Sequence, residues 1–156
     1  HAFALIHKKH PLTRLNLLGD GELLEQTQAL AKTLGLSDSV DFLGSQSNVY
    51  PYLQNSDLFL LPSRYEGMPM TLIEAMGTGL PIVASKVGGV PDMLEDGKSA
   101  ILTDCNPEKV AQAVCRMLED EALRKTLGRA AKADSETFSA AHMAESYVRV
   151  YRAEGA

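Results

Sequence analysis

Short apolar runs alternate along the chain with longer segments in which apolar residues recur every three or four positions. The first pattern is typical of strands buried on both faces, and the second is typical of amphipathic helices. The sequence predicts strands at residues 14–18, 40–43, 58–61, 81–84 and 100–102. Because helical segments separate these strands, we expect an α/β fold with a parallel sheet covered by helices on both faces.

Helix boundaries are marked mainly by proline, glycine and capping residues. Pro11 ends a first helical segment at residues 1–10, and Gly35 ends a second whose apolar residues lie within 23–34. Shorter helical segments are predicted at residues 49–55 and 90–94.

The C-terminal third is predicted to be helical. Asn106 is expected to cap a helix that has Pro107 at its first position and Glu108 in its first turn. A second helix is expected to end near Gly128, and an amphipathic helix to cover residues 137–152.

The stretch between the third and fourth predicted strands carries the candidate chemistry. The apolar run stops at Pro62, a polar loop follows, and Thr71 opens a helical segment. Ligands of open α/β sheets bind beyond the carboxyl ends of strands, where N–H groups of the next helix lack partners. Glu66 and Glu74, separated by seven residues, could face one ligand from opposite ends of the loop.

A purely structural interpretation of these residues is also open. The spacing of Thr71 and Glu74 is that of a capping box, in which Glu74 accepts a hydrogen bond from the Thr71 N–H, and spacing alone favours it. An isolated Glu66 would be a solvated charge. We expect the side chains of Met68, Met70 and Met76 to pack rather than to contact a ligand.

Composition narrows the class of protein. The 156 residues suit a single domain, and 45% hydrophobic with 22% charged residues is ordinary for a globular chain. A formal charge of −5 argues against nucleic-acid binding. We see no apolar run long enough to span a bilayer and no signal peptide. Cys105 and Cys115 lack metal-ligand spacing and are expected to be reduced thiols of a cytoplasmic protein.

Several motifs in order resemble those of the glycosyltransferase group 1 family, retaining enzymes with a GT-B fold. They are Gly19-Asp20-Gly21-Glu22, Phe42-Leu43-Gly44, and the series from Pro62 through Glu66, Glu74 and Gly88-Gly89 to Asp92. The resemblance implies the C-terminal, donor-binding, Rossmann-like half of a GT-B fold. Since the family's first strand is central and this chain begins in the helix after it, we expect a gap in the middle of the sheet.

The resemblance also implies a nucleotide-diphosphate sugar as donor, with no metal or other cofactor. It makes Glu66 the catalytic residue near the reacting sugar carbon and Glu74 the acceptor of ribose hydroxyl hydrogen bonds. The remaining donor-binding residues, acting mostly through their backbones, would be Gly67, Met68, Met70, Thr71, Gly19, Gly44, Ser45 and Gln46. Pro69 has no N–H to offer and stands where many relatives have glycine.

Three further sets of residues have candidate roles. Gly19 and Gly21 either let the backbone approach the ligand or simply make a turn. Gly88-Gly89 is expected to permit a similarly close approach, with Lys86 nearby as a candidate for phosphate. Tyr50 and Tyr52 either stack on the base or belong to the core.

The family's diphosphate-stabilising Arg and Lys precede the first helix and are not in this sequence. We therefore expect a fragment whose missing N-terminal domain binds the acceptor, and which binds donor weakly without transferring sugar. The parent enzyme would act on a glycan or lipid-linked acceptor, in polysaccharide biosynthesis and peripherally at a membrane. Apolar residues of the last helical segment would be partly uncovered and favour self-association. They are Phe138, Met143, Tyr147, Val150 and Tyr151.

Two other functions fit fewer of the motifs. A sugar-nucleotide epimerase would share the two-domain architecture but direct catalytic acids at the sugar. A non-catalytic nucleotide-binding or interaction module would carry the motif without using it, so that changing Glu74 to Gln would leave nucleotide binding unchanged.

Overall fold

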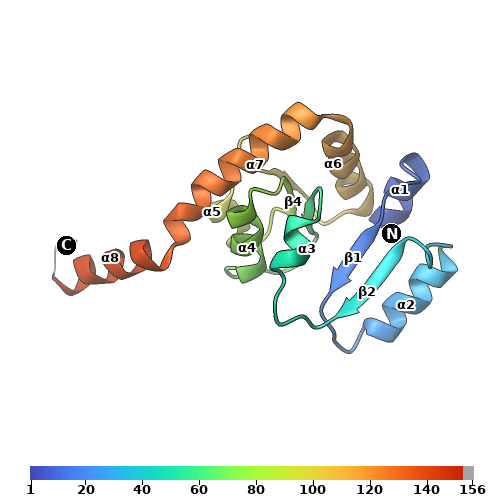
Figure 1. Ribbon diagram of the computed structural model, residues 1–156, viewed down its shortest axis with the longest axis horizontal. Coiled ribbons are helices and arrows are strands. Elements are labelled where there is room, and N and C mark those ends of the chain that lie inside the picture. Colours follow the sequence, from blue (N-terminus) through green and yellow to red (C-terminus); the bar gives the residue numbers. More distant parts are fainter. Residues whose placement is uncertain (153–156) are drawn as a thin grey trace.

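The computed structural model describes residues 1–152, in which strands and helices alternate along the chain (Figure 1). The strands are β1 (Leu15–Leu18), β2 (Val40–Gly44), β3 (Phe59–Leu61), β4 (Ile82–Ser85) and β5 (Ile101–Thr103). The helices are α1 (Ala2–Lys9), α2 (Leu24–Thr33), α3 (Tyr50–Gln54), α4 (Met70–Thr78), α5 (Val90–Met93), α6 (Pro107–Glu119), α7 (Glu121–Ser135) and α8 (Ala140–Tyr151), with a 3₁₀ turn at Glu136–Phe138.

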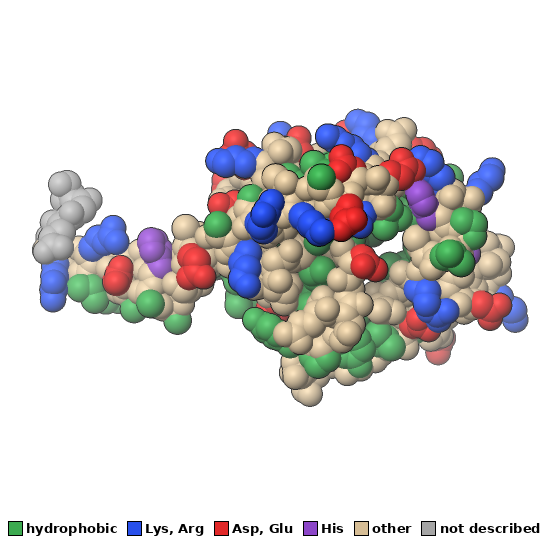
Figure 2. Space-filling view, turned by 45° about the horizontal axis from the view of Figure 1, so that its top comes forward, with side chains coloured by type: hydrophobic (Ala, Val, Ile, Leu, Met, Phe, Trp, Pro, Cys, Tyr) green, Lys and Arg blue, Asp and Glu red, His purple; other side chains and the backbone are tan. Residues whose placement is uncertain are grey.

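The strands are parallel and form two sheets. β1 pairs with β2, and β3, β4 and β5 pair in that order. The predicted α/β fold with parallel strands is therefore confirmed, and the division into two sheets agrees with the expected gap. Figure 2 shows a hollow between the part of the molecule that contains β1 and β2 and the larger part.

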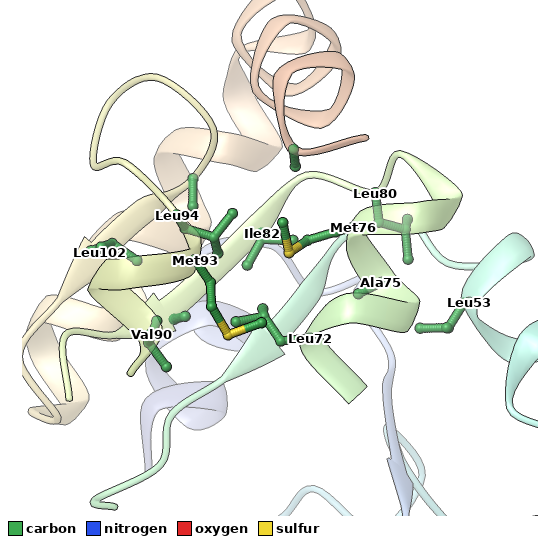
Figure 3. Packing of buried hydrophobic residues seen from close by; sticks show 13 residues of the cluster. Leu53, Leu72, Ala75, Met76, Leu80, Ile82, Val90, Met93, Leu94 and Leu102 are labelled. Carbon is green, nitrogen blue, oxygen red and sulfur yellow. The ribbon is translucent and has the colours of Figure 1, made fainter. Parts of the chain in front are cut away.

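One face of the larger sheet is covered by α4 and α5. Alternate residues of a strand point to opposite faces, so Ile82 and Ala84 of β4 lie on this side, together with Leu72 of α4 and Met93 of α5. Figure 3 shows the side chains of Leu72 and Met93 pointing toward one another. This packing fixes the helix that follows the predicted active loop directly onto the sheet.

The opposite face is covered by α1 and α6, and here the two sheets share one apolar cluster. Val83 of β4 packs in this cluster with Phe3 and Ile6 of α1 and with Leu15 and Leu17 of β1. Helices α1 and α6 are in extensive contact, and the Lys9 ammonium lies 2.6 Å from the Glu119 carboxylate. Helix α1 therefore connects the smaller sheet to the larger one by hydrophobic packing.

The second C-terminal helix does not end near Gly128 as the sequence suggested. It continues to Ser135, and Gly128 is buried within it. A Cβ atom at Gly128 would lie 2.2 Å from the carbonyl oxygen of Gly79, closer than any real Cβ contact. Gly128 is thus a contact residue that lets α7 approach the end of α4, and it is not a helix terminator.

Helix α8 projects from the rest of the molecule, and none of its residues is buried (Figure 1). The expected amphipathic helix is therefore present, although a 3₁₀ turn precedes it and Ser139 caps it. Apolar side chains line one side of the projecting helix in Figure 2. Met143, Tyr147, Val150 and Tyr151 are all more than half exposed, as expected, while Phe138 packs against the core. Self-association through this helix stays a prediction.

Candidate functional site

Helix α4 begins one residue earlier than the sequence suggested, and its N-cap is Pro69. Pro69 has extended backbone angles (φ −70°, ψ 116°), and its carbonyl accepts the N–H groups of Leu72 (3.1 Å) and Ile73 (3.4 Å). Thr71 is consequently the second helical residue, and Glu74 lies beyond the first turn. The capping box is wrong, because the extended proline takes the capping position that the box requires of Thr71.

The two candidate glutamates are partly exposed. Glu66, in the loop after β3, and Glu74, in α4, are both half-buried. Within residues 1–152 neither side chain has a hydrogen-bond or salt-bridge partner. Since Glu74 is not needed for capping, both carboxylates are available to accept hydrogen bonds from a ligand.

The loop between them offers several backbone donors. In the described part of the chain, the N–H groups of Gly67, Met68, Met70 and Thr71 donate to no protein acceptor. They lie at the N-terminus of a nine-residue helix, where the helix dipole favours anions. Pro69 interrupts this series and contributes no donor. The arrangement suits hydroxyl or phosphate oxygens.

The methionines behave differently from the expectation. Met76 is fully buried in the core, but the side chains of Met68 and Met70 are each 62% exposed. Most of each side chain therefore faces solvent, although Pro69 between them is buried. Their thioethers and the 91% exposed ring of Tyr65 give the loop an apolar rim.

The loops after β1 and β2 lie against each other. The N–H of Gly19 donates to the carbonyl of Gly44 at 2.7 Å, and both glycines have positive φ angles of 116° and 65°. No protein atom lies within 4 Å of a Cβ added at either position, so here glycine serves the turn and not a close contact within the protein.

The other candidates for binding the nucleotide base differ in side-chain exposure and in hydrogen bonding. Ser45 is exposed, whereas the Gln46 side-chain amide donates to the Leu43 carbonyl of its own loop. Tyr50 is 48% exposed, and Tyr52 is partly buried, so the ring of Tyr50 is not a core residue.

Gly88-Gly89 was assigned from the sequence to a close approach of the ligand. The structure places both glycines against the backbone of Glu66 and Gly67, and an approach to the ligand stays a prediction. The contacts therefore join the candidate loops in two groups, with Gly19 and Gly44 in one and the Glu66–Gly67 loop with Gly88-Gly89 in the other. Sequence reasoning missed this second contact. The one signal that could have indicated it was the double glycine after a buried strand.

Two surface grooves lie elsewhere on the molecule. One, of about 580 Å³, runs between α1 and α6, and the other follows β5 and includes Lys86, Asp104 and Lys109. Neither groove is lined by Glu66 or Glu74. Among residues 1–152, no group of three or more His, Cys, Asp or Glu side chains could hold a metal ion. Over the same residues, no helix combines the length and apolarity that crossing a membrane requires.

Comparison with known proteins identifies relatives along almost the whole chain. The chain is 36% identical over 146 residues to the Vi polysaccharide biosynthesis protein VipC/TviE of Salmonella typhi, covering 90% of this chain and 25% of that protein. It is 35% identical over 140 residues to N-acetyl-alpha-D-glucosaminyl L-malate synthase of Bacillus anthracis, covering 88% and 37%. The chain thus spans well under half the length of these relatives.

A solved structure has the same fold. The crystal structure of Anabaena Alr3699/HepE in complex with UDP matches 97% of this chain and 44% of its own, with a TM-score of 0.88 at 24% identity. This likeness supports the Rossmann-like half of a GT-B architecture. The family model for glycosyl transferases group 1 matches residues 1–134, and the chain therefore belongs to that family.

Proposed function

We propose that this chain is the donor-binding domain of a retaining glycosyltransferase that uses a nucleotide-diphosphate sugar in polysaccharide biosynthesis. The observation that carries the proposal is the loop after β3 together with the start of α4, where two carboxylates and four backbone N–H groups lack protein partners within the described residues. Carboxylates suit sugar hydroxyls, and N–H groups at a helix N-terminus suit phosphate. A nucleotide sugar contains both kinds of group.

The proposed roles are those that the family resemblance implies. Glu74 accepts hydrogen bonds from the ribose hydroxyls, and Glu66 lies by the donor sugar at the reacting carbon. The N–H groups of Gly67, Met68, Met70 and Thr71 hold sugar hydroxyl and phosphate oxygens. Gly19, Gly44, Ser45 and Gln46 line the side that takes the base.

In the proposed reaction the bond between the anomeric carbon and the phosphate oxygen breaks, and its electron pair leaves with the nucleotide diphosphate. The acceptor hydroxyl oxygen then bonds to the same face of the sugar, and its proton passes to the departing diphosphate. Fixed cations would stabilise the leaving group without a metal. We place these cations upstream of α1 in this same domain and the acceptor site in a further domain, in keeping with the greater length of the relatives.

The choice of a first donor comes from a structural neighbour. Crystal structures of Anabaena Alr3699/HepE contain UDP, UDP with glucose, or UDP-glucose. This supports beginning with uridine nucleotides. A cytoplasmic location, peripheral membrane association and a glycan or lipid-linked acceptor stay predictions.

The test is a titration of the 156-residue chain with UDP, ADP, GDP and their glucose conjugates, followed by calorimetry or by amide NMR shifts. We expect one nucleotide series to bind, and we expect Glu74→Gln to weaken that binding by about 1–3 kcal/mol because a charged hydrogen bond is lost. This corresponds to an affinity about 5- to 150-fold lower.

Glu136→Gln is the matched control, because Glu136 is an exposed glutamate in the 3₁₀ turn after α7. It should bind nucleotide as the unchanged chain does. Equal affinity of Glu74→Gln and the unchanged chain would favour an interaction module instead. Sugar transfer by the 156-residue chain alone would contradict the assignment of the cations to residues upstream of α1.

A further inference from the structure

Gly88 and Gly89 make an unusually close contact with the loop that carries Glu66. A Cβ atom added at Gly88 would lie 1.7 Å from the carbonyl oxygen of Glu66, and one added at Gly89 would lie 2.3 Å from that of Gly67. Real Cβ atoms essentially never approach another atom within 3.0 Å. Two consecutive glycines therefore support two consecutive peptide groups at a distance that no other residue type permits.

The glycine turn is itself firmly held. On its N-terminal side every residue of β4 is buried, the Val87 N–H donates to Ser85 (2.9 Å), and the Lys86 N–H donates to Thr103 of β5 (2.8 Å). On its C-terminal side Val90 is fully buried in the core. The turn therefore cannot retreat from the loop without moving the sheet or the core.

The loop above the turn has little other support. Within residues 1–152, residues 63–68 make no hydrogen bond, and Tyr65 and Met68 point into solvent. The nearest attachments are the Pro62 carbonyl, which accepts from the Cys105 thiol at 3.3 Å, and the buried Pro69. Between these two points the described support is the contact with Gly88 and Gly89.

We propose that Gly88 and Gly89 are positioning residues that fix the backbone of Glu66 and Gly67, and so the place of the Glu66 carboxylate relative to the donor sugar. The inference rests on the proposed function for the role of Glu66, but the mechanical part does not. A catalytic side chain keeps its position only when the backbone of its own residue is fixed.

Gly89→Ala is the cleaner of the two variants. Gly89 has a φ of −80°, which any residue adopts, so the contact with the Gly67 carbonyl is the main obstacle to a side chain. Gly88 has a φ of +51°, and its substitution would add backbone strain. Gly77→Ala is the matched control, because the nearest atom to its new Cβ is the Tyr50 hydroxyl oxygen at 3.9 Å.

The mechanical part is tested by NMR on the 156-residue chain. In the unchanged chain, we expect backbone order parameters of Glu66 and Gly67 near about 0.85, as in rigid secondary structure, despite the absence of hydrogen bonds. Gly89→Ala should shift the amide signals of residues 64–68 and lower these order parameters, whereas Gly77→Ala should not. Order parameters below about 0.6 in the unchanged chain would overturn the inference without any variant.

The functional part compares UDP-glucose with UDP. Gly89→Ala should weaken UDP-glucose binding at least about threefold and weaken UDP binding less, because Glu74, which holds the ribose, lies in α4 and does not depend on the turn. An equal loss for both ligands, or no loss, would overturn the positioning role. If the unchanged chain binds neither ligand, the use of uridine donors fails, and the NMR result alone decides whether the turn positions the loop.

Discussion

The connection between the two sheets can be tested at Ile6 of α1. Ile6 is 2% exposed and packs in the apolar cluster that both sheets share. Replacing it with Ala removes three carbon atoms, worth about 2.4 kcal/mol at about 0.8 kcal/mol for each buried methylene. The remaining cavity adds to this loss, and measured costs of such changes are about 2–5 kcal/mol. We therefore expect the free energy of unfolding to fall by about 3 kcal/mol.

Leu5→Ala is the control, since Leu5 is the neighbouring residue of the same helix but is 43% exposed. Its replacement should cost about 1 kcal/mol or less. Urea unfolding followed by circular dichroism gives both values. In a chain of this size a loss of 3 kcal/mol also corresponds to a decrease in Tm of about 6–12 °C.

Amide hydrogen exchange shows which elements the substitution destabilises. If α1 holds the smaller sheet in place, Ile6→Ala should accelerate amide exchange in β1 and β2 more than in α4. A stability loss equal to that of Leu5→Ala would refute the reasoning, and so would acceleration spread evenly over β1, β2 and α4. Either result would mean that the smaller sheet is held by something other than α1.

Two further predictions concern α6. The Asn106 side chain accepts the Lys109 N–H at 3.0 Å, so Asn106→Ala should lower the free energy of unfolding by about 1 kcal/mol in urea titrations, unlike the exposed Asn16→Ala. Hydrogen bonds from Lys9 and His10 hold the pKa of Glu119 below the ordinary 4.5, so its stabilising contribution is present above pH 4.5 and is lost as pH falls through the lower, folded-state pKa. Glu119→Gln should therefore lower the Tm at pH 7 and make the decrease of Tm toward acid pH shallower. An unchanged dependence of Tm on pH would count against this ion pair.

Local signals in the sequence located most elements correctly. The apolar runs fall on strands β1 to β5, and Asn106 caps α6 with Pro107 at its first position, as expected. Gly35 follows the end of α2 with a φ of +70°, the left-handed conformation that a terminating glycine adopts. These features depend on residues close in sequence, and so the sequence alone is enough to predict them.

At the candidate site one prediction from the sequence agrees with the structure and another does not. The order of the motifs indicated the loop after β3, with Glu66 in it and Glu74 in the helix that follows, and both glutamates are partly exposed in the structure. Spacing favoured a capping box for Thr71 and Glu74, but an extended Pro69 starts the helix earlier and leaves Glu74 uninvolved. A capping pattern indicates that a helix starts nearby, while the residue that takes the N-cap position depends on the backbone that enters it.

Sequence by itself determined the alternating elements, the parallel α/β class and the position of the acidic loop, because each is encoded by periodicity or by neighbouring residues. Only the tertiary structure decided what Gly88, Gly89 and Gly128 do. Each touches a backbone that is remote in sequence, Glu66, Gly67 or Gly79, and a glycine's lack of a side chain gives no sign of which segment will come close to it. The physical reason is that close packing is a property of two surfaces, and the local sequence describes only one of them.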